Sequence, residues 1–389
     1  IIFITNLEAT THNLALYGSN TIDLDDVTSL NLSGRWNWAS LKMEDQYSTA
    51  LEGHHFFNEF NPGVGITRKL GDTLALGNTT VYATYKESSR NPSVAELGCA
   101  DPAQPCRLPN SFQADPPLDE VKNRSFEFGA RGVKDGLNLF GLDHSINWNA
   151  TAFAGRNFND IIFIGGNRVG TGYFRNVGNT QRMGTELAIN GKLGKNITWY
   201  GNYSYVRASF ETHQKIASAG HSEALLIACE GPEEYGGGGN AAATADQESC
   251  EARESYQIQV GPGDAIPGVS PHIGRVGIGF IPFDGLGLFV DTEYNSRQFY
   301  RGDENNAEGK QVPGYFLLNA SLEYTVPRAN SDAAGLSTSI FIEGRNLLDT
   351  NFESGGILAE NEVDGTGGSG TFVTPGQPLT VFGGMKFTW

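Results

Sequence analysis

The sequence predicts an all-β protein, an antiparallel transmembrane β-barrel with about 13 strands in this chain. Three observations predict this fold. Apolar and polar residues alternate with a period of two along most of the chain, and no segment shows the 3.6-residue period of an amphipathic helix. The alternating segments are joined by short and long connections in strict turn. A soluble β-sandwich, which is the alternative fold, has no reason to sort its connections by length.

The alternating segments are the candidate strands, and the last one shows the pattern most clearly. Its residues Leu379, Val381, Met385, Phe387 and Trp389 fall on one face, and Thr380, Gly384, Lys386 and Thr388 fall on the other, together with Phe382. The thirteen segments are 12–24, 27–42, 60–70, 75–88, 121–134, 144–158, 172–191, 197–211, 270–282, 286–302, 313–327, 336–350 and 377–389. The alternation predicts that Trp199, Leu318, Leu322 and Phe387 face lipid.

The connections between these segments predict how the chain is oriented. The short ones lie at Asp25-Asp26, Gly71-Asp72, 135–143, 192–196, 283–285 and 328–335, and the long ones at 43–59, 89–120, 159–171, 212–269, 303–312 and 351–376. Outer-membrane barrels have short periplasmic turns and longer extracellular loops, so the long connections are expected outside the cell. Single-chain bacterial barrels close with an even number of strands. We therefore expect residues 1–389 to be part of a larger barrel.

Composition narrows the class of protein. The net charge is −17, which argues against a nucleic-acid partner. No apolar run approaches the roughly 20 residues of a spanning helix. The four cysteines form two closely spaced pairs in stretches rich in Pro, Gly and Asn, and we expect local disulfides Cys99–Cys106 and Cys229–Cys250. Such pairs suit an oxidising compartment.

Four stretches resemble TonB-dependent receptors. The ending 375–389, PGQPLTVFGGMKFTW, resembles the terminal strand of that family, and 341–349, FIEGRNLLD, is similar to its NL(F/L)D signature. The stretch 173–186, YFRNVGNTQRMGTE, resembles the N-x-G … G-x-E strand. The stretch 89–97, SRNPSVAEL, resembles the FRAP … EL segment, although Ser89 and Asn91 depart from it and only Arg90 and Pro92 keep the frame. The resemblance covers nearly the whole chain.

The resemblance implies a 22-stranded barrel that encloses an N-terminal plug. Residues 1–389 would then be the C-terminal part of the barrel domain, without the plug. The implied function is TonB-energised uptake of a large, scarce nutrient, such as a ferric siderophore or a similar metal chelate. The implied partners are a TonB-type energising complex that acts through the missing N-terminal part, the barrel assembly machinery through Trp389, outer-membrane lipid and lipopolysaccharide, and the chelate. A passive porin and a structural or enzymatic barrel are the alternative functions.

Charged residues opposite the apolar faces predict the lining of the barrel, because an Arg or Lys on the lipid face costs roughly 2–4 kcal/mol at the midplane. The inward positions are Arg35, Lys86, Glu127, Arg131, Arg156, Glu186, Arg275, Asp291, Glu293, Arg297, Glu323, Glu343, Arg345 and Lys386. Nine of them are the candidates for contact with a plug: Arg35, Glu127, Arg131, Glu186, Arg275, Glu293, Glu323, Glu343 and Arg345. Their mixed signs favour a plug over the open channel of a porin.

Aromatic and arginine residues near the outer strand ends are the candidate ligand contacts. They are Tyr173, Phe174, Arg297, Phe299, Tyr300 and Arg301. This combination suits an anionic, aromatic chelate, although such aromatics also form the ordinary girdle of a barrel. The acidic 212–269 connection is either a solvated surface or a site for a cationic ligand. No Ser-His-Asp or paired-carboxylate arrangement stands out, so no enzyme activity, cofactor or bound metal is expected.

Overall fold

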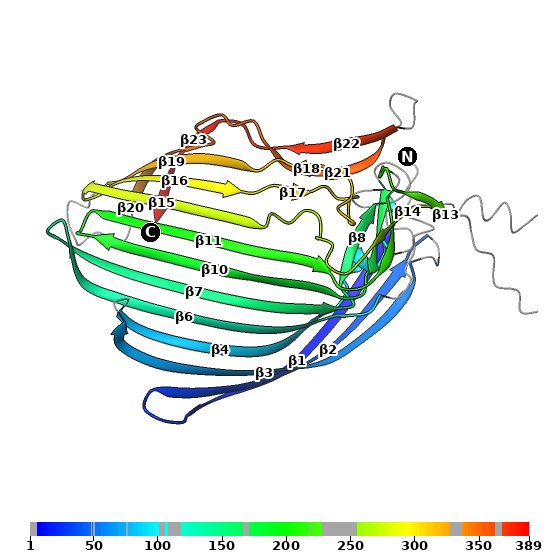
Figure 1. Ribbon diagram of the computed structural model, residues 1–389, viewed down its shortest axis with the longest axis horizontal. Helices are drawn as coiled ribbons and strands as arrows, with labels where there is room; N and C mark the ends of the chain where they lie inside the picture. The colour runs from blue at the N-terminus through cyan, green and yellow to red at the C-terminus, as the bar shows by residue number, and fades with distance from the viewer. Residues whose placement is uncertain are drawn as a thin grey trace, which may run out of the picture.

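The computed structural model describes residues 6–47, 49, 51–74, 77–100, 106–107, 118–165, 171–218, 220–227, 255–326, 337–361 and 368–388. These residues are built almost wholly of strands (Figure 1). The described chain contains one four-residue helix, α1 (Val94–Leu97). No helix in this part of the chain is long and apolar enough to cross a membrane.

A single antiparallel sheet of 13 strands forms the body of the molecule. The order of these strands in the sheet is the same as their order along the chain. The strands are β1 (Leu7–Asp23), β2 (Thr28–Asp45), β3 (Gly53–Leu74), β4 (Gly77–Arg90), β6 (Val121–Leu139), β7 (Leu142–Phe158), β10 (Thr180–Leu193), β11 (Ile197–Phe210), β15 (His272–Phe283), β16 (Leu286–Asn295), β19 (Tyr315–Thr325), β20 (Ser337–Arg345) and β23 (Thr380–Thr388). Each of the thirteen predicted segments overlaps one strand of this sheet, which confirms the predicted fold class.

The strand register sorts side chains onto two faces, because residues directly opposite each other on neighbouring strands share a face. Leu322 lies opposite Leu288 and Ile342 on one face, whereas its neighbour Glu323 lies opposite Phe341 on the other. Extending this register along the sheet gives one apolar face and one polar face. Trp199, Leu318, Leu322 and Phe387 lie on the apolar face, and Glu323, Glu343 and Arg345 lie on the polar face.

The described residues do not cover the apolar face. Leu16 is 71% exposed, Phe126 63% and Val276 62%. A continuous apolar surface of this kind is unfavourable in water and suits contact with hydrocarbon.

The two ends of the sheet differ in their connections. At one end the strands join through tight turns, as at Asp25, whose carboxylate accepts hydrogen bonds from the backbone N–H groups of Val27 and Thr28 at 2.8 and 2.7 Å. The β6–β7 turn places Phe140 and Gly141 at positive φ, 54° and 77°. We call this end the turn end and the opposite end, which holds the long connections, the loop end.

The long connections contain short strands of their own, which the sequence did not predict. They are β5 (Cys106–Arg107), β8 (Ile161–Gly165), β9 (Thr171–Asn176), β12 (Gln214–Ala217), β13 (Leu225–Ile227), β14 (Ser255–Val260), β17 (Gln298–Phe299), β18 (Gln311–Val312), β21 (Glu353–Asn361) and β22 (Gly368–Pro375). They form four small sheets, β5-β9-β8, β12-β14-β13, β17-β18 and β21-β22, and gather at the loop end (Figure 1). The predicted segments 172–191 and 286–302 are therefore each divided between a long strand and a loop-end strand.

Three hydrophobic clusters lie at the loop end. The first joins Phe210 and Ala208 of β11 to residues of β8, β9, β12 and β14. The second joins Leu41 and Met43 of β2 to Leu97 of α1. The third contains Tyr300, Val312 and Leu358. The described residues thus bury their hydrophobic core at the loop end, not within the sheet.

Candidate functional site

The polar face of the sheet carries charged side chains of both signs. The Arg345 guanidinium contacts the Glu343 carboxylate at 2.7 Å and lies 5.1 Å from the centre of the Phe382 ring, and Arg275 forms an ion pair with Glu293. Arg275, Glu186, Asn149 and Asn202 line one shallow hollow on this face. The nine candidates for contact with a plug, Arg35, Glu127, Arg131, Glu186, Arg275, Glu293, Glu323, Glu343 and Arg345, all lie on the polar face. Contact with a plug remains a prediction.

Two of the predicted inward positions were wrong. Arg156 lies opposite Arg124 and Gln181, on the same face as Phe126 and therefore on the apolar side of the sheet. Its inward neighbour in the strand is Asn157, because a shift of one residue moves a side chain to the other face. Arg297 follows the end of β16 at Asn295 and precedes β17, so it belongs to the loop end and not to the sheet.

Two of the candidate ligand contacts, Tyr173 and Phe174, are part of the packing between connections. Tyr173 on β9 is 5% exposed and belongs to the cluster around Phe210, and burial raises the pKa of its hydroxyl. The Phe174 ring meets the Phe163 ring edge to face at 5.1 Å, and its backbone N–H donates to the Cys99 carbonyl. In this conformation the Tyr173 ring does not reach the surface.

The other four candidates lie at the ribbon formed by β17 and β18: Phe299 belongs to β17, and Arg297, Tyr300 and Arg301 directly flank this strand. Tyr300 is 7% exposed, packs on Val312 and Leu358, and donates its hydroxyl to the Glu353 carboxylate at 3.1 Å. Burial, and then this hydrogen bond, raises the pKa of Tyr300. Phe299 pairs with Gln311 in the same ribbon and is half-buried. Tyr300 therefore anchors the ribbon, and its ring is not free to contact a ligand.

Arg297 and Arg301 present exposed side chains on this ribbon. The backbone of Arg301 is held by hydrogen bonds to Gly356 and from Leu358, of 3.1 and 2.7 Å. Neither guanidinium has an ion-pair or hydrogen-bond partner among the described residues. The structure thus brings two unneutralised cations to a rigidly held edge of the loop end.

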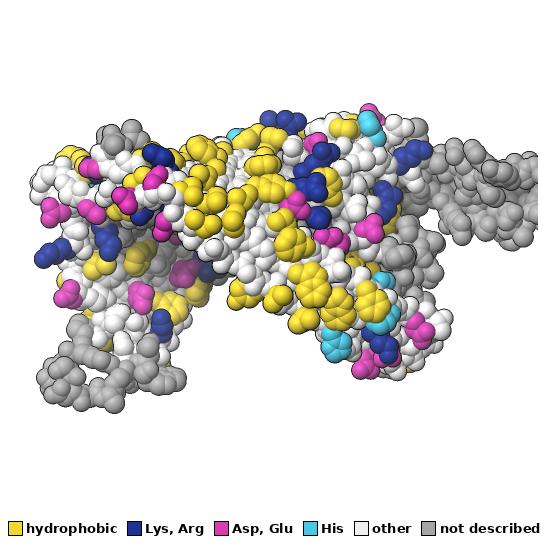
Figure 2. Space-filling view, turned by 90° about the horizontal axis from the view of Figure 1, so that it is seen from below, with side chains coloured by type: hydrophobic (Ala, Val, Ile, Leu, Met, Phe, Trp, Pro, Cys, Tyr) yellow, Lys and Arg dark blue, Asp and Glu magenta, His cyan; other side chains and the backbone are white. Residues whose placement is uncertain are grey.

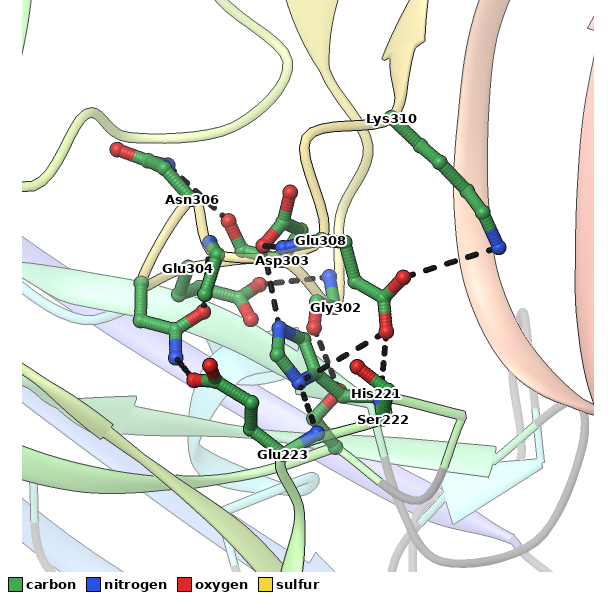
Figure 3. A network of polar contacts seen from close by, with 12 residues as sticks. His221, Ser222, Glu223, Gly302, Asp303, Glu304, Asn306, Glu308 and Lys310 are labelled. Carbon is green, nitrogen blue, oxygen red and sulfur yellow. Dashed lines mark hydrogen bonds and ion pairs between the residues drawn. The ribbon is translucent and has the colours of Figure 1, made fainter.

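A buried polar network that the sequence did not predict joins this ribbon to the β12–β13 connection (Figure 3). The His221 Nε2 atom lies 3.2 Å from Asp303 Oδ1, and both side chains are fully buried. The backbone N–H of Glu223 donates to His221 Nδ1 at 3.0 Å. Because Nδ1 accepts a hydrogen bond, the proton of the neutral ring lies on Nε2, which donates to Asp303. We call this network, centred on His221 and Asp303, the latch.

Further hydrogen bonds of the latch connect segments that are far apart in the sequence. The Ser222 N–H donates to Glu308 Oε1 at 2.6 Å, and the Ser218 hydroxyl donates to the Gly302 carbonyl at 2.5 Å. The Asn306 side chain accepts from the Ala265 N–H at 2.6 Å and donates to the Ala265 carbonyl at 3.0 Å. Polar contacts therefore hold together residues 218 and 220–223, residue 265 and residues 302–308.

Burial controls the charges within the latch. It raises the pKa of Glu304 to about 7, although the Gly302 N–H donates to this carboxyl at 2.9 Å. It also raises the pKa of Asp303, against the opposing effect of hydrogen bonds from Glu308 and His221. The Ser222 N–H lowers the pKa of Glu308. No group of three metal-ligating side chains occurs in the described part of the chain.

Residues 89–97 form the base of the connection between β4 and β6. Ser93 caps α1, because its hydroxyl accepts a hydrogen bond from the Glu96 N–H at 3.2 Å. In turn, the Glu96 carboxylate accepts a hydrogen bond from the Ser93 N–H at 2.7 Å. Arg90 donates to both Glu96 oxygens, at 2.9 and 2.7 Å, while Leu97 is fully buried. These residues therefore have structural roles. Cys99, just beyond, is disulfide-bonded. Its pairing with Cys106 remains a prediction, and Cys229, Cys250 and Trp389 lie outside the described residues.

The other two internal stretches are also structural. Asn346, at φ 50°, donates to the carbonyls of Thr350 and Gln377 at 2.9 and 3.0 Å, and Asp349 accepts from the Leu379 N–H at 3.1 Å. Asn176 donates to the carbonyls of Asn159 and Asp119 at 2.7 and 3.1 Å. Asn346 and Asp349 fix the β20–β21 corner against the entry to β23, and Asn176 fixes the base of the β7–β10 connection.

Comparison with known proteins agrees with this architecture. A family model described as "TonB dependent receptor-like, beta-barrel" matches residues 4–347. No curated protein sequence matches. Among solved structures, the fold is similar to that of the copper transporter OprC, with a TM-score of 0.60 and 15% identity over 98% of this chain and 48% of that one. It is also similar to the ferric-catecholate import receptor Fiu from E. coli K12, with a TM-score of 0.57 and 16% identity over 99% of this chain and 45% of that one.

A third similar structure is the ferric yersiniabactin uptake receptor FyuA from Yersinia pestis, with a TM-score of 0.59 and 14% identity over 99% of this chain and 46% of that one. At these identities the likeness shows the fold alone. The chain spans a little under half the length of each of these three structures.

Proposed function

Because the chain belongs to the TonB-dependent receptor-like β-barrel family, whose members lie in the outer membrane, we propose that it is the C-terminal part of the barrel domain of a plugged receptor. This receptor takes up a large, scarce nutrient with energy supplied through TonB. The nutrient is a metal chelate of the ferric siderophore type. The printed names of three proteins of similar fold refer to copper transport or to ferric-chelate uptake, which supports this class of ligand.

The observation that carries the proposal is the lining of the polar face. An open channel needs water-compatible side chains, but it does not need charges of both signs close together. Here Glu186 and Arg275 line one hollow, and Glu343 and Arg345 lie two residues apart on one strand. Such groups suit hydrogen bonds and ion pairs with a folded plug domain inside the barrel.

The ligand contacts that the proposal retains are Arg297 and Arg301. A guanidinium is always charged and binds carboxylate or catecholate oxygens in a fixed, forked geometry. These two lack a partner among the described residues, whereas Tyr173 and Tyr300 are buried in the packing of the loop end. The apolar face meets lipid, and the loop end with both arginines lies outside the cell.

Uptake of radiolabelled ferric chelates by intact cells tests the function. The protein is expressed with its complete upstream sequence, in cells that have or lack the inner-membrane energising complex. We expect uptake of at least one catecholate or carboxylate chelate that requires the complex. Equal uptake in both strains would show passive diffusion and would favour a porin.

A further inference from the structure

We propose that Glu59 and Glu120 form a proton-dependent clasp, which fastens the end of the β4–β6 connection to β3 in acidic medium and releases it as the medium becomes alkaline. We call this pair the carboxyl clasp. It is separate from the latch, because it holds a different connection and shares no residue with it. The inference concerns the loop end and does not depend on the proposed uptake function.

The carboxyl clasp lies where a long connection meets the sheet. Glu120 is the last residue before β6, and its neighbours Leu118 and Val121 are buried in the second hydrophobic cluster. The Asp119 N–H donates to the side-chain oxygen of Asn176 at 2.9 Å. The backbone on both sides of Glu120 is thus fixed, and its carboxyl is held close to β3.

Both residues of the clasp lie beyond the part of the sheet that meets hydrocarbon. A spanning strand needs about 9–11 residues. The strand β3 has 22 residues, and Glu59 lies on the stretch beyond its pairing with β4, which ends at Gly63. Figure 2 shows a band of hydrophobic side chains across one side of the molecule, with Lys and Arg side chains gathered between that band and the loop end. The clasp is therefore in contact with the aqueous medium at the loop end.

Two acids meet in the clasp, and one of them needs a proton. The Glu120 and Glu59 side chains share a hydrogen bond, which two charged carboxylates cannot form. Glu120 Oε2 is buried and receives no hydrogen bond from the described residues. A charged oxygen in that position is costly, whereas a protonated Glu120 donates to Glu59. The geometry therefore favours a closed form in which Glu120 carries the proton.

The charged groups around Glu120 do not neutralise a second carboxylate in the clasp. They are Glu59, Glu87, Arg90, Glu96, Asp119, Lys122 and Arg124. Lys122 is shared between Glu59 and Glu87, at 2.8 and 3.7 Å. Arg124 pairs with Glu87 at 3.2 Å. Arg90 pairs with Glu96 at 2.7 Å. No cation of the described chain lies within ion-pair distance of Glu120, and Asp119 adds a further negative charge.

The direction of the pH response follows from these surroundings. Burial, and then the hydrogen bond with Glu59, raises the pKa of Glu120 to about 7, above its ordinary value of 4.5. The closed form therefore binds the proton more tightly than the open form, in which water surrounds the carboxyl. The contribution of the clasp to the closed form is complete below about pH 4.5 and is lost as the pH rises through about 7.

Hydrogen exchange of the full-length receptor in lipid nanodiscs, at about pH 5.5 and about pH 8.5, tests the proposal. The reporter is the segment 118–121, corrected for the intrinsic exchange rate, and its protection should be about tenfold greater at the lower pH. In Glu120→Gln the amide donates to Glu59 without titrating, so protection should stay high and vary little with pH. Glu52→Gln is the matched control, since Glu52 is an exposed acid in the β2–β3 connection, and it should keep the tenfold ratio.

Two further measurements test whether the response belongs to this pair. Glu59→Gln removes the negative neighbour of Glu120, so the pH at which protection is lost should fall by about one unit. Residues 302–308 of the latch should respond to pH alike in Glu120→Gln and in the unchanged protein. Equal protection of 118–121 at both pH values, or an undiminished response in Glu120→Gln, would overturn the proposal. An unchanged midpoint in Glu59→Gln, or an altered latch response in Glu120→Gln, would overturn the assignment to this pair.

Discussion

The sheet and the loop end of this molecule achieve burial in different ways. The sheet leaves both faces uncovered by the described chain, and residues such as Phe128, 61% exposed, depend on lipid for an apolar environment. The loop end buries Phe210, Leu97 and Ile216 completely, in clusters that link separate connections. The loop end therefore resembles a small soluble domain built on a membrane sheet, and its stability has different sources. Four predictions test this contrast.

Truncation of a phenylalanine should cost much more stability at the loop end than on the apolar face of the sheet. Phe210→Ala leaves a cavity in the largest cluster and should destabilise the loop end by about 3–5 kcal/mol. Phe128→Ala, the matched control on the apolar face, should change stability far less, because lipid fills the space. Limited proteolysis of the receptor in lipid, followed by mass spectrometry, measures the opening of the connections. Equal protease resistance of the two variants would contradict the contrast.

A charge should distinguish the two faces of the sheet at adjacent positions. Leu322→Arg places a guanidinium on the apolar face and should cost up to about 2–4 kcal/mol, depending on depth in the membrane. Ser321→Arg should be nearly neutral, because Ser321 lies opposite Glu343 on the polar face. The midpoint of urea unfolding in lipid vesicles provides the measurement. A larger loss for Ser321→Arg would mean that the faces are reversed.

The latch should be more stable in mild acid than at neutral pH. The pKa of the Glu304 carboxyl is about 7 in the folded loop end, against an ordinary value of 4.5 in the unfolded chain. The carboxyl therefore binds its proton more tightly when the loop end is folded. This contribution is complete below about pH 4.5 and is lost as the pH rises through about 7, with an upper limit of about 3 kcal/mol. Hydrogen exchange of residues 218–223 and 302–308, corrected for the intrinsic rate, should therefore show greater protection at pH 5 than at pH 8.

The variant Glu304→Gln is the control for this effect, since the amide has the shape of the protonated acid and does not titrate. Protection in Glu304→Gln should vary much less between the two pH values. A pH response as large as that of the unchanged protein would assign the effect to another group, such as Asp303, whose pKa burial also raises.

The smallest expected effect concerns ligand binding at the exposed ribbon. Arg297→Ala/Arg301→Ala should weaken the binding of an anionic ferric chelate about tenfold, which is about 1.4 kcal/mol, without altering assembly or protease resistance. Lys215→Ala removes another exposed cation from the loop end and should leave affinity unchanged. The affinity is measured by titrating the full-length receptor with the chelate that the uptake assay identifies. Unchanged affinity in the arginine variant would remove the ribbon from the ligand site.

The same contrast explains what the sequence could predict. Alternation is a local pattern, and the segment around Leu318 and Leu322 shows both faces within a few residues, so every long strand was predicted. Arg156 was misplaced because a single-residue error in alternation reverses the face, and its strand has Asn157 and Gly155 on the other side. Motif residues such as Asn346 were recognised, but their hydrogen bonds across a corner became visible only in the structure.

The latch could not be predicted from local patterns. His221 and Asp303 are 82 positions apart and belong to different connections. The only sign of the latch in the sequence was the pair Asp303-Glu304, followed by Glu308. Acidic residues in such a connection are typical of a solvated surface. Burial of these acids depends on three stretches that fold together, which no local period encodes.

The latch also limits the ways in which the outer surface can move. Because residues 218–223 (apart from 219), 265 and 302–308 share hydrogen bonds, the connections after β11 and β16 have fewer independent degrees of freedom than their lengths suggest. A force applied to the ribbon at Arg301 would be transmitted to the tops of two hairpins together. The lengths of these two connections are therefore mechanically linked, and an insertion into one that displaces His221 or Asp303 would release both.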